Sequence, residues 1–190
     1  MQDTELWQRL IGGDKGALGL IYSQHADYLL QYGHRLTQDE LIIEDCVHDL
    51  FVDLWRTHNG LSPTNAIRPY LIVSLRRRII RKIQQQQKFK DQEKVPEIDF
   101  QAEIAVDELI ISQEVSEEQA AMLKKAFTQL TGRQREAIFL KYYEEMDYKD
   151  IAETMGISYQ SVRNVVFTGI KKLREIMVLV CILIGSLFIL

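Results

Sequence analysis

The chain has 190 residues, which is enough for one ordinary hydrophobic core or for two small ones. Apolar residues make up 46% and charged residues 26%, with three prolines and ten glycines, so the composition excludes a disordered chain. Two distant cysteines, Cys46 and Cys181, suit neither a disulfide framework nor a four-ligand zinc site, and the polar opening MQDTELWQRL is no secretory signal, so we expect a cytoplasmic protein.

The net charge of -4 is unevenly distributed along the chain. Residues 1–64 hold four basic and ten acidic residues, whereas residues 65–90 hold eight basic residues and no acid. Residues 91–118 reverse the balance with ten acids and one lysine, and residues 119–175 return to ten bases against seven acids. Basic segments therefore alternate with acidic ones, so the negative net charge does not count against binding of nucleic acid.

Apolar residues recur at intervals of three and four throughout, and no stretch alternates with period two. This pattern predicts an all-α fold of two small helical bundles joined by an acidic linker, the second containing a helix-turn-helix. We expect domains at 1–90 and 117–175, a linker at 91–116 and an apolar tail at 176–190. Helices in the first bundle should break at Gly12-Gly13, at 37–39 and at 58–66.

The segment EDCVHDLFVDLWRTH predicts an amphipathic helix with an acidic outer face. The inner stripe is expected to contain Val47, Leu50, Phe51 and Leu54, and the outer stripe Asp45, Asp49, Asp53 and Arg56. Such a face is either a solvated surface or a docking site for a basic protein partner. Cys46 and His48 lack a second pair of metal ligands, so we predict no metal site and no cofactor.

The segment IRPYLIVSLRRRIIRKIQQQQK predicts a helix with an apolar stripe at Ile72, Leu75, Ile79 and Ile83. The opposite face should carry Tyr70, Arg77, Arg81, Gln84 and Lys88, flanked by Arg76, Arg78 and Lys82. With no carboxylate expected nearby, this cationic ridge should attract phosphates, and its edge can stack on an unpaired base. The alternative is a merely solvated charge run.

The segment YKDIAETMGISYQSVRNVVFTGIKKLR has the spacing of a helix-turn-helix. Ala152 allows close approach, Gly156 allows the turn, and Ser158 should cap the second helix. Val162, Val165 or Val166, Gly169 and Leu173 should face inward, leaving Tyr159, Gln160, Arg163, Asn164 and Lys171 to reach base edges or phosphates. The alternative is a helical hairpin whose polar residues face water.

Two blocks, EDCVHDLFVDLW and LTGRQREAIFLKYYEEMDYKDIAETMGISYQSVRNVVFTGIKKLR, resemble the extracytoplasmic-function group of the sigma-70 family over about residues 4–175. The resemblance implies a transcription initiation factor that binds core RNA polymerase and promoter DNA and has no enzymatic activity. It implies polymerase contacts by Asp45, His48, Asp49, Asp53 and Trp55, and recognition and melting of the -10 element by Asn59, Arg68, Tyr70, Arg76, Arg77, Arg81 and Lys82. It also implies recognition of the -35 element by Ser158, Tyr159, Gln160, Ser161, Arg163, Asn164, Lys171 and Lys172, and regulation by an anti-sigma factor.

The sequence departs from the family pattern in both blocks. His48 stands where relatives usually have glutamine, and Val165, Phe167, Thr168 and Ile170 replace residues that are often basic or small and polar. We therefore expect weak binding to the -35 element that depends on tethering of the two modules. The competing hypothesis is a stand-alone helix-turn-helix regulator that is not a polymerase subunit.

The tail IMVLVCILIGSLFIL has no charged residue and, as a helix, would span about 22 Å against a hydrocarbon core of roughly 30 Å. Packing on this chain, binding of an inhibitory partner, and peripheral contact with the inner membrane leaflet all remain open.

Overall fold

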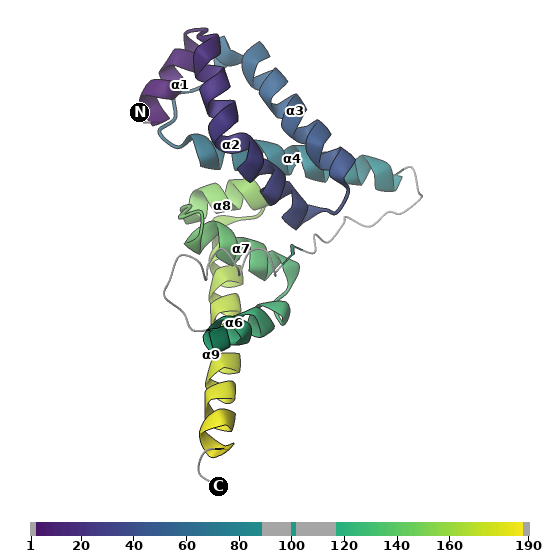
Figure 1. Ribbon diagram of the computed structural model, residues 1–190, viewed down its shortest axis with the longest axis vertical. Coiled ribbons are helices and arrows are strands. Elements are labelled where there is room, and N and C mark those ends of the chain that lie inside the picture. The colour runs from purple at the N-terminus through teal and green to yellow at the C-terminus, as the bar shows by residue number, and fades with distance from the viewer. Residues whose placement is uncertain (1–2, 89–99, 102–116, 188–190) are drawn as a thin grey trace. The chain divides into compact units, whose positions relative to one another are not determined.

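The computed structural model describes residues 3–88, 100–101 and 117–187, with side chains at all of these except 87–88, 117–120 and 177–187. Every regular element in these ranges is a helix, which confirms the predicted all-α class (Figure 1). None of the described helices is long and apolar enough to cross a membrane. The chain divides into two compact units, Met1–Pro96 and Glu97–Leu190, and this division lies within the stretch expected to be the linker.

The first unit contains α1 (Asp3–Ile11), α2 (Lys15–Leu36), α3 (Glu40–Arg56), the short 3-10 helix η1 (His58–Gly60) and α4 (Ile67–Lys88). The three predicted breaks are confirmed, and the first two have a clear local cause. Gly13 adopts a φ of 85° after α1, and the Asp14 carboxylate then accepts hydrogen bonds from the first free amides of α2. Asp39 caps α3 in the same way, by accepting from the amide of Ile42.

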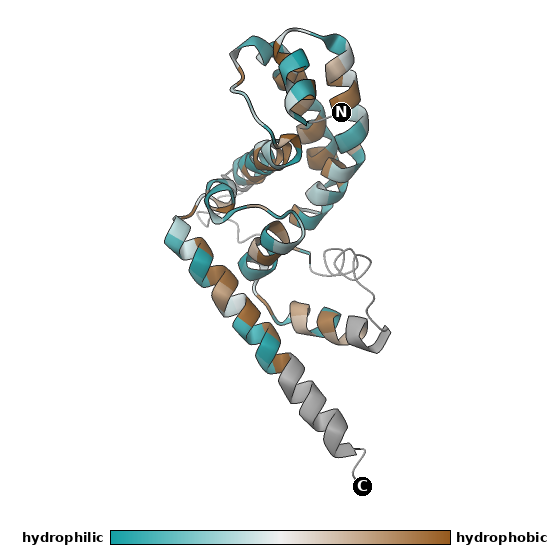
Figure 2. Ribbon diagram, turned by 90° about the vertical axis from the view of Figure 1, so that its left-hand side faces the viewer, coloured by the Kyte–Doolittle hydropathy of each residue, from teal (hydrophilic) through white to brown (hydrophobic). Residues whose placement is uncertain are grey.

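Helices α2, α3 and α4 pack against one another pairwise and enclose the core of this unit. Figure 2 shows hydrophobic residues alternating with hydrophilic ones along the helices, as expected for helices with one apolar face. The predicted inner residues of α3, namely Val47, Leu50, Phe51 and Leu54, are all buried. Those of α4 are buried at Ile72, Leu75 and Ile79, whereas Ile83 is only half-buried near the end of the helix.

Side chains of α1 fix the loop that leads into α4. The indole of Trp7 donates to the carbonyl oxygen of Ser62 at 2.9 Å, and the Asp3 carboxylate accepts from the amide of Ile67 at 3.0 Å. Because Asp3 satisfies a free amide at the start of α4, the first helix sets where the basic helix begins.

The second unit contains α6 (Glu117–Thr128), α7 (Gly132–Tyr142), α8 (Tyr148–Met155) and α9 (Tyr159–Leu187). Thr131 and Gln134 form a capping box at the start of α7, and Asp147 caps α8. Helix α9 packs against α6, α7 and α8, so it organises the unit.

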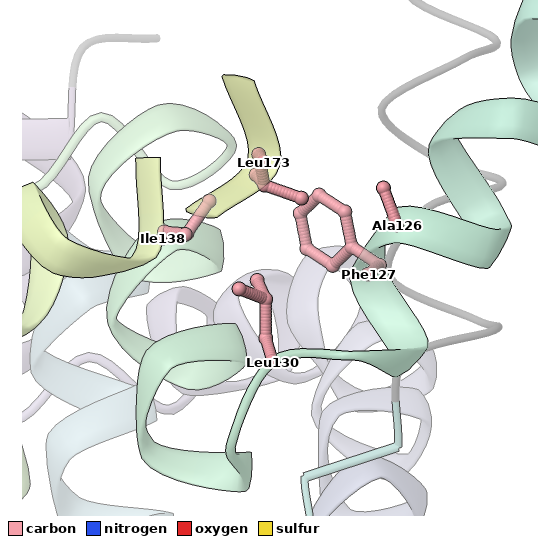
Figure 3. Packing of buried hydrophobic residues seen from close by; sticks show 5 residues of the cluster. All are labelled: Ala126, Phe127, Leu130, Ile138 and Leu173. Atoms are coloured by element: carbon pink, nitrogen blue, oxygen red, sulfur yellow. The ribbon is translucent and has the colours of Figure 1, made fainter. Parts of the chain in front are cut away.

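A cluster of apolar side chains joins α6, α7 and α9 (Figure 3). Phe127 lies between Leu173 of α9 and Leu130, with Ala126 and Ile138 completing the cluster. Close packing of α7 on α9 requires Gly169, because a Cβ atom there would lie 2.8 Å from the Cδ1 atom of Ile138. The predicted inward position of Gly169 is thereby confirmed and explained.

One residue from the expected linker belongs to this second unit. Phe100 is fully buried, and its ring centroid lies 5.5 Å from that of Phe139 in α7, which stacks in turn on Tyr143. The chain is therefore anchored well before α6 begins.

Candidate binding surfaces

The α8–α9 pair has the geometry of a helix-turn-helix. Gly156 ends α8 with a φ of 66°, in the left-handed region where a side chain would be strained. The Ser158 hydroxyl then accepts from the amide of Ser161 at 3.1 Å and lies 2.8 Å from the Ser161 hydroxyl. Both expectations for the turn are met, and Ser158 and Ser161 hold each other in place at the N-terminus of α9.

The inner face of α9 is formed by Val162, Val166, Gly169 and Leu173, so Val166 rather than Val165 takes the buried position. The residues expected to face outward, Tyr159, Gln160, Arg163, Asn164 and Lys171, are all exposed. Arg163 is the cation nearest the helix start. This polar surface lies along the first turns of a helix, where side chains can reach the major groove of DNA.

Two aromatic residues that the sequence analysis did not assign to DNA contact lie on the same surface. Tyr142 of α7 and Phe167 of α9 are exposed, the latter by 69%, and both line a pocket that also includes Gln160, Arg163 and Asn164. Phe167 lies one helical turn after Arg163, a spacing that could have placed it on this face from the sequence.

Lys171 and Lys172 are exposed near the far end of the packed part of α9. The Lys171 ammonium lies 3.8 Å from the Glu175 carboxylate, and Lys172 donates to the carbonyl oxygen of Gln129. Both contacts are at the surface, where ion pairs contribute little to stability, so either lysine can exchange its contact for a phosphate.

The outer side of α3 carries an apolar pocket next to the predicted acidic residues. Its volume is about 440 Å³, and its lining comes from α2 and α3: Leu18, Tyr22, Leu30, Glu44, Val47, His48, Phe51, Val52 and Trp55. Tyr22 and Val52 are exposed large hydrophobic residues, which is unusual for a solvated surface. An apolar depression beside carboxylates can accept a protein helix with apolar and basic residues.

Trp55 is fixed at the end of this pocket. Its ring stacks on the imidazole of His58 with centroids 4.7 Å apart, and the His58 Nδ1–H donates to the Trp55 carbonyl oxygen at 2.6 Å. The ammonium of Lys15 lies 6.0 Å above the indole. The stacking on η1 holds the indole in one orientation.

The expectation that no carboxylate neutralises the basic helix is wrong. Arg78 donates to the Asp53 carboxylate at 2.9 Å, and Lys82 donates to that of Asp45 at 2.9 Å. The two helices cross so that acidic residues of α3 meet basic residues of α4. Residue spacing predicts which face of each helix is charged but not how two helices pack against each other. The ion pairs between α3 and α4 could therefore not be predicted from the sequence.

These contacts also change the ionisation of the paired groups. The hydrogen bond from Arg78 lowers the pKa of Asp53, and the hydrogen bond to Asp45 raises the pKa of Lys82. Asp53 therefore stays ionised to lower pH, and Lys82 stays protonated to higher pH, than either group would without its partner.

The ridge predicted on α4 is narrower than expected. Arg76 is only 9% exposed, so it belongs to the interior and not to the accessible face on which the sequence analysis placed it. Arg77 and Arg81 are exposed and lie one helical turn apart. The remaining exposed cationic surface of the described part of α4 is therefore centred on Arg77 and Arg81.

The other residues expected near the -10 element lie where the loop meets α4. Tyr70 packs edge-on against Trp7 with ring centroids 4.9 Å apart, and the Arg68 guanidinium lies 3.7 Å above the ring of Tyr28. Asn59 is exposed in η1. Arg68 and Tyr70 are half-buried, so each has a packing role as well as any binding role.

Cys46 and His48 point in different directions, since Cys46 is buried and the side chain of His48 is 78% exposed. Burial raises the pKa of the Cys46 thiol, which keeps it protonated. Within the described ranges, no three cysteine, histidine or carboxylate side chains gather as metal ligands would.

Comparison with known families decides the identity of the fold. Residues 21–89 match Sigma-70 region 2, and residues 120–173 match Sigma-70, region 4. The chain belongs to the sigma-70 family. The two matches cover most of the α2–α4 bundle and the helix-turn-helix, so both surfaces described above lie largely within family regions.

Curated relatives narrow the family to its extracytoplasmic-function (ECF) group. The chain is 21% identical to the ECF RNA polymerase sigma factor SigK of Mycolicibacterium vanbaalenii, over 85% of this chain and 82% of that one. It is 18% identical to SigK of Mycobacterium ulcerans, over 90% of each. Together with the family regions, these relatives identify the chain as an RNA polymerase sigma factor of the ECF group.

Solved structures agree on the fold. CnrH, solved in complex with the cytosolic domain of CnrY, superposes with a TM-score of 0.54 at 19% identity, covering 92% of this chain and 96% of that one. The sigma factor RpoE from Bartonella quintana, in complex with the anti-sigma factor NepR, gives 0.52 at 20% identity over 86% and 95% of the two chains. The all-helical architecture of this sigma factor is therefore shared with that of solved members.

Proposed function

We propose that this sigma factor binds core RNA polymerase through the outer side of α3. The observation that carries this assignment is the apolar pocket bounded by His48, Val52 and Trp55, beside the exposed carboxylate of Asp49. Asp45 and Asp53 contribute less directly, because each carboxylate already holds a cation of α4. A polymerase segment with apolar residues and a basic rim fits this surface.

The adjacent basic helix then engages the -10 element. Exposure of Arg77 and Arg81 supports contacts with the DNA backbone, and Asn59 lies in the loop before α4, where an unpaired base can be received. Lys82 contributes through its position beside Asp45, and Tyr70 and Arg68 shape the edge of the site. Melting proceeds by binding the separated strand, so the protein supplies no chemical catalysis.

The start of α9 reads the -35 element. Ser158 and Ser161 fix the helix N-terminus, Tyr159, Gln160, Arg163 and Asn164 are exposed along its first turns, and Lys171 and Lys172 contact phosphates further along. Arg163 is the best donor for a base edge, since arginine binds guanine through two hydrogen bonds.

The same surfaces would be the targets of regulation. The solved relatives CnrH and RpoE are bound to CnrY and to the anti-sigma factor NepR, respectively. We propose that an anti-sigma protein covers the α3 pocket of this chain and thereby competes with core polymerase. A protein that works with polymerase and promoter DNA acts in the cytoplasm.

Association with core polymerase tests the proposal. Purified protein is mixed with core polymerase, and the complex is measured by native gel and by run-off transcription from a promoter library. Asp49→Arg should weaken the complex at least tenfold, because it places a like charge against a basic partner. Asp27→Arg makes the same exchange at an exposed position of α2 and should leave the complex intact.

Two results would contradict the proposal. If the parent protein binds promoter duplex but never core polymerase, the chain is a stand-alone regulator. If Asp49→Arg and Asp27→Arg weaken the complex equally, the polymerase surface lies elsewhere.

A further inference from the structure

The last helix continues well past the unit that it organises. Helix α9 runs unbroken from Tyr159 to Leu187, and its last residues with known packing are Leu173, in the buried cluster, and Ile176 at its edge. Figure 1 shows the end of α9 extending beyond α6. At 1.5 Å per residue, the stretch from Ile176 to Leu187 adds about 18 Å of helix.

This extension has no polar side in its sequence. After Glu175 there is no charged residue, and only Cys181, Gly185 and Ser186 interrupt the large apolar side chains up to Leu187. At 100° per residue these positions cover every direction around the helix axis. A helix that is apolar all round needs apolar surroundings on all sides, whereas one partner helix would cover a single stripe. A lipid leaflet meets that requirement.

Cations surround the helix where the extension begins. Lys171, Lys172 and Arg174 are exposed on successive sides of α9, while Leu173 between them faces the core. Glu175 is the single acid of this turn and lies 3.8 Å from Lys171. A ring of basic residues next to an apolar segment matches the phosphate layer of an anionic membrane, worth about 1 kcal/mol for each charge near the surface.

We propose that the C-terminal end of α9 inserts into an anionic lipid bilayer. Lys171, Lys172 and Arg174 then lie near the headgroup phosphates, and the apolar part of the helix after Ile176 enters the acyl-chain region.

Membrane binding would also compete with promoter binding. Lys171 and Lys172 are assigned here both to lipid phosphates and to DNA phosphates, so one helix turn serves two anionic partners. This competition rests on the proposed function, whereas the lipid contact itself does not. The membrane would therefore sequester the -35-reading unit.

Vesicle flotation tests the lipid contact on the full chain. The protein is synthesised in a cell-free system with vesicles of phosphatidylcholine and phosphatidylglycerol in equal parts, and bound protein rises in a density gradient while aggregates stay at the bottom. We expect most of the parent protein to float. Leu179→Asp with Leu183→Asp should reduce flotation more than tenfold, because charge is costly among acyl chains. The matched control, Leu179→Ile with Leu183→Ile, should float like the parent.

The ring of cations is tested separately. Arg174→Gln should weaken binding to the anionic vesicles about fivefold, the factor that corresponds to about 1 kcal/mol per charge. Lys149→Gln removes an exposed charge of α8 and should have no effect. Vesicles of phosphatidylcholine alone should bind the parent less than the mixed vesicles do.

The proposal is overturned if the parent protein stays at the bottom of the gradient, or if the aspartate and isoleucine variants float equally. It is also overturned if the parent self-associates, the aspartate variant does not, and neither the parent nor the aspartate variant floats. The competition is measured as promoter binding with and without anionic vesicles. Vesicles should inhibit the parent but not the aspartate variant. If the parent fails to bind promoter DNA even without vesicles, the proposed function fails and the lipid result stands independently.

Discussion

The basic helix α4 gives a quantitative prediction about salt. Its five arginines and lysines between residues 76 and 82 differ in accessibility, because Arg76 is buried and Arg78 and Lys82 hold carboxylates of α3. Arg77 and Arg81 remain exposed. Each phosphate contact contributes about 0.7 for single strands to about 0.9 for duplex to the slope of log affinity against log salt. Replacing both exposed arginines with alanine should therefore lower this slope by about 1.5.

The assay measures binding of holoenzyme to a promoter fragment whose -10 element is held open, over a series of potassium chloride concentrations. The parent, Arg77→Ala with Arg81→Ala, and Arg78→Ala with Lys82→Ala are compared. The last variant removes the same formal charge from the same helix, but from Arg78 and Lys82, whose side chains are only 30% and 34% exposed. The salt slope of this variant should fall by less than about half of the fall expected for Arg77→Ala with Arg81→Ala.

The reasoning is refuted if the two double variants lower the slope equally, because accessibility would then not decide which cations contact phosphate. An unchanged slope for Arg77→Ala with Arg81→Ala would remove α4 from the DNA surface altogether. Core polymerase binding of each variant is the control, since a lost holoenzyme would imitate lost DNA contacts.

Three further predictions concern single positions. Phe100→Ala should lower the free energy of unfolding of the second unit by about 3 kcal/mol in denaturant titrations, whereas Phe167→Ala, at an exposed site, should change it by less than about 0.5 kcal/mol; equal effects would contradict the anchoring of Phe100. Burial lowers the pKa of His25 below its ordinary value of 6.5, so below about pH 6.5 the unfolded chain binds more protons than the folded one. The free energy of unfolding should therefore decrease as the pH is lowered through this range. His25→Gln should flatten that fall in thermal unfolding measured across this range, and an unaltered profile would exclude His25 as its source. Arg163→Ala should weaken binding to a -35 duplex by about 1 to 3 kcal/mol in fluorescence anisotropy, and Lys149→Ala should not.

The sequence was sufficient for the fold class and for the local geometry of the elements. Helix ends at Gly13, Asp39 and Gly156 follow from turn and cap preferences that act within a few residues. The buried stripes of α3 and α9 follow from the helical period, because a face that repeats every 3.6 residues must be covered by something. These are short-range rules, and the structure meets them.

The errors lie where two helices meet. Arg76 and Arg77 are neighbours in one basic run, yet one is buried and the other exposed, and periodicity alone did not separate the flank of the helix from its outer face. The pairing of Asp53 with Arg78 depends on how α3 crosses α4, which no spacing within either helix encodes. The apolar pocket beside Trp55 is likewise made jointly by α2 and α3. The candidate residues could thus be identified from the sequence, but which of their side chains are exposed to a binding partner could not.

Phe100 sets a limit on promoter architecture. Because its ring is buried against Phe139, the covalent connection available between the two units runs from the end of α4 to Phe100 and not to the start of α6. At roughly 3.5 Å per residue, the greatest distance that this connection can bridge is about 40 Å instead of about 100 Å. If the two units read the two promoter elements as proposed, moving the elements apart by several base pairs would exhaust that reach sooner, and burial of Phe100 would restrict the spacer lengths that the factor can use.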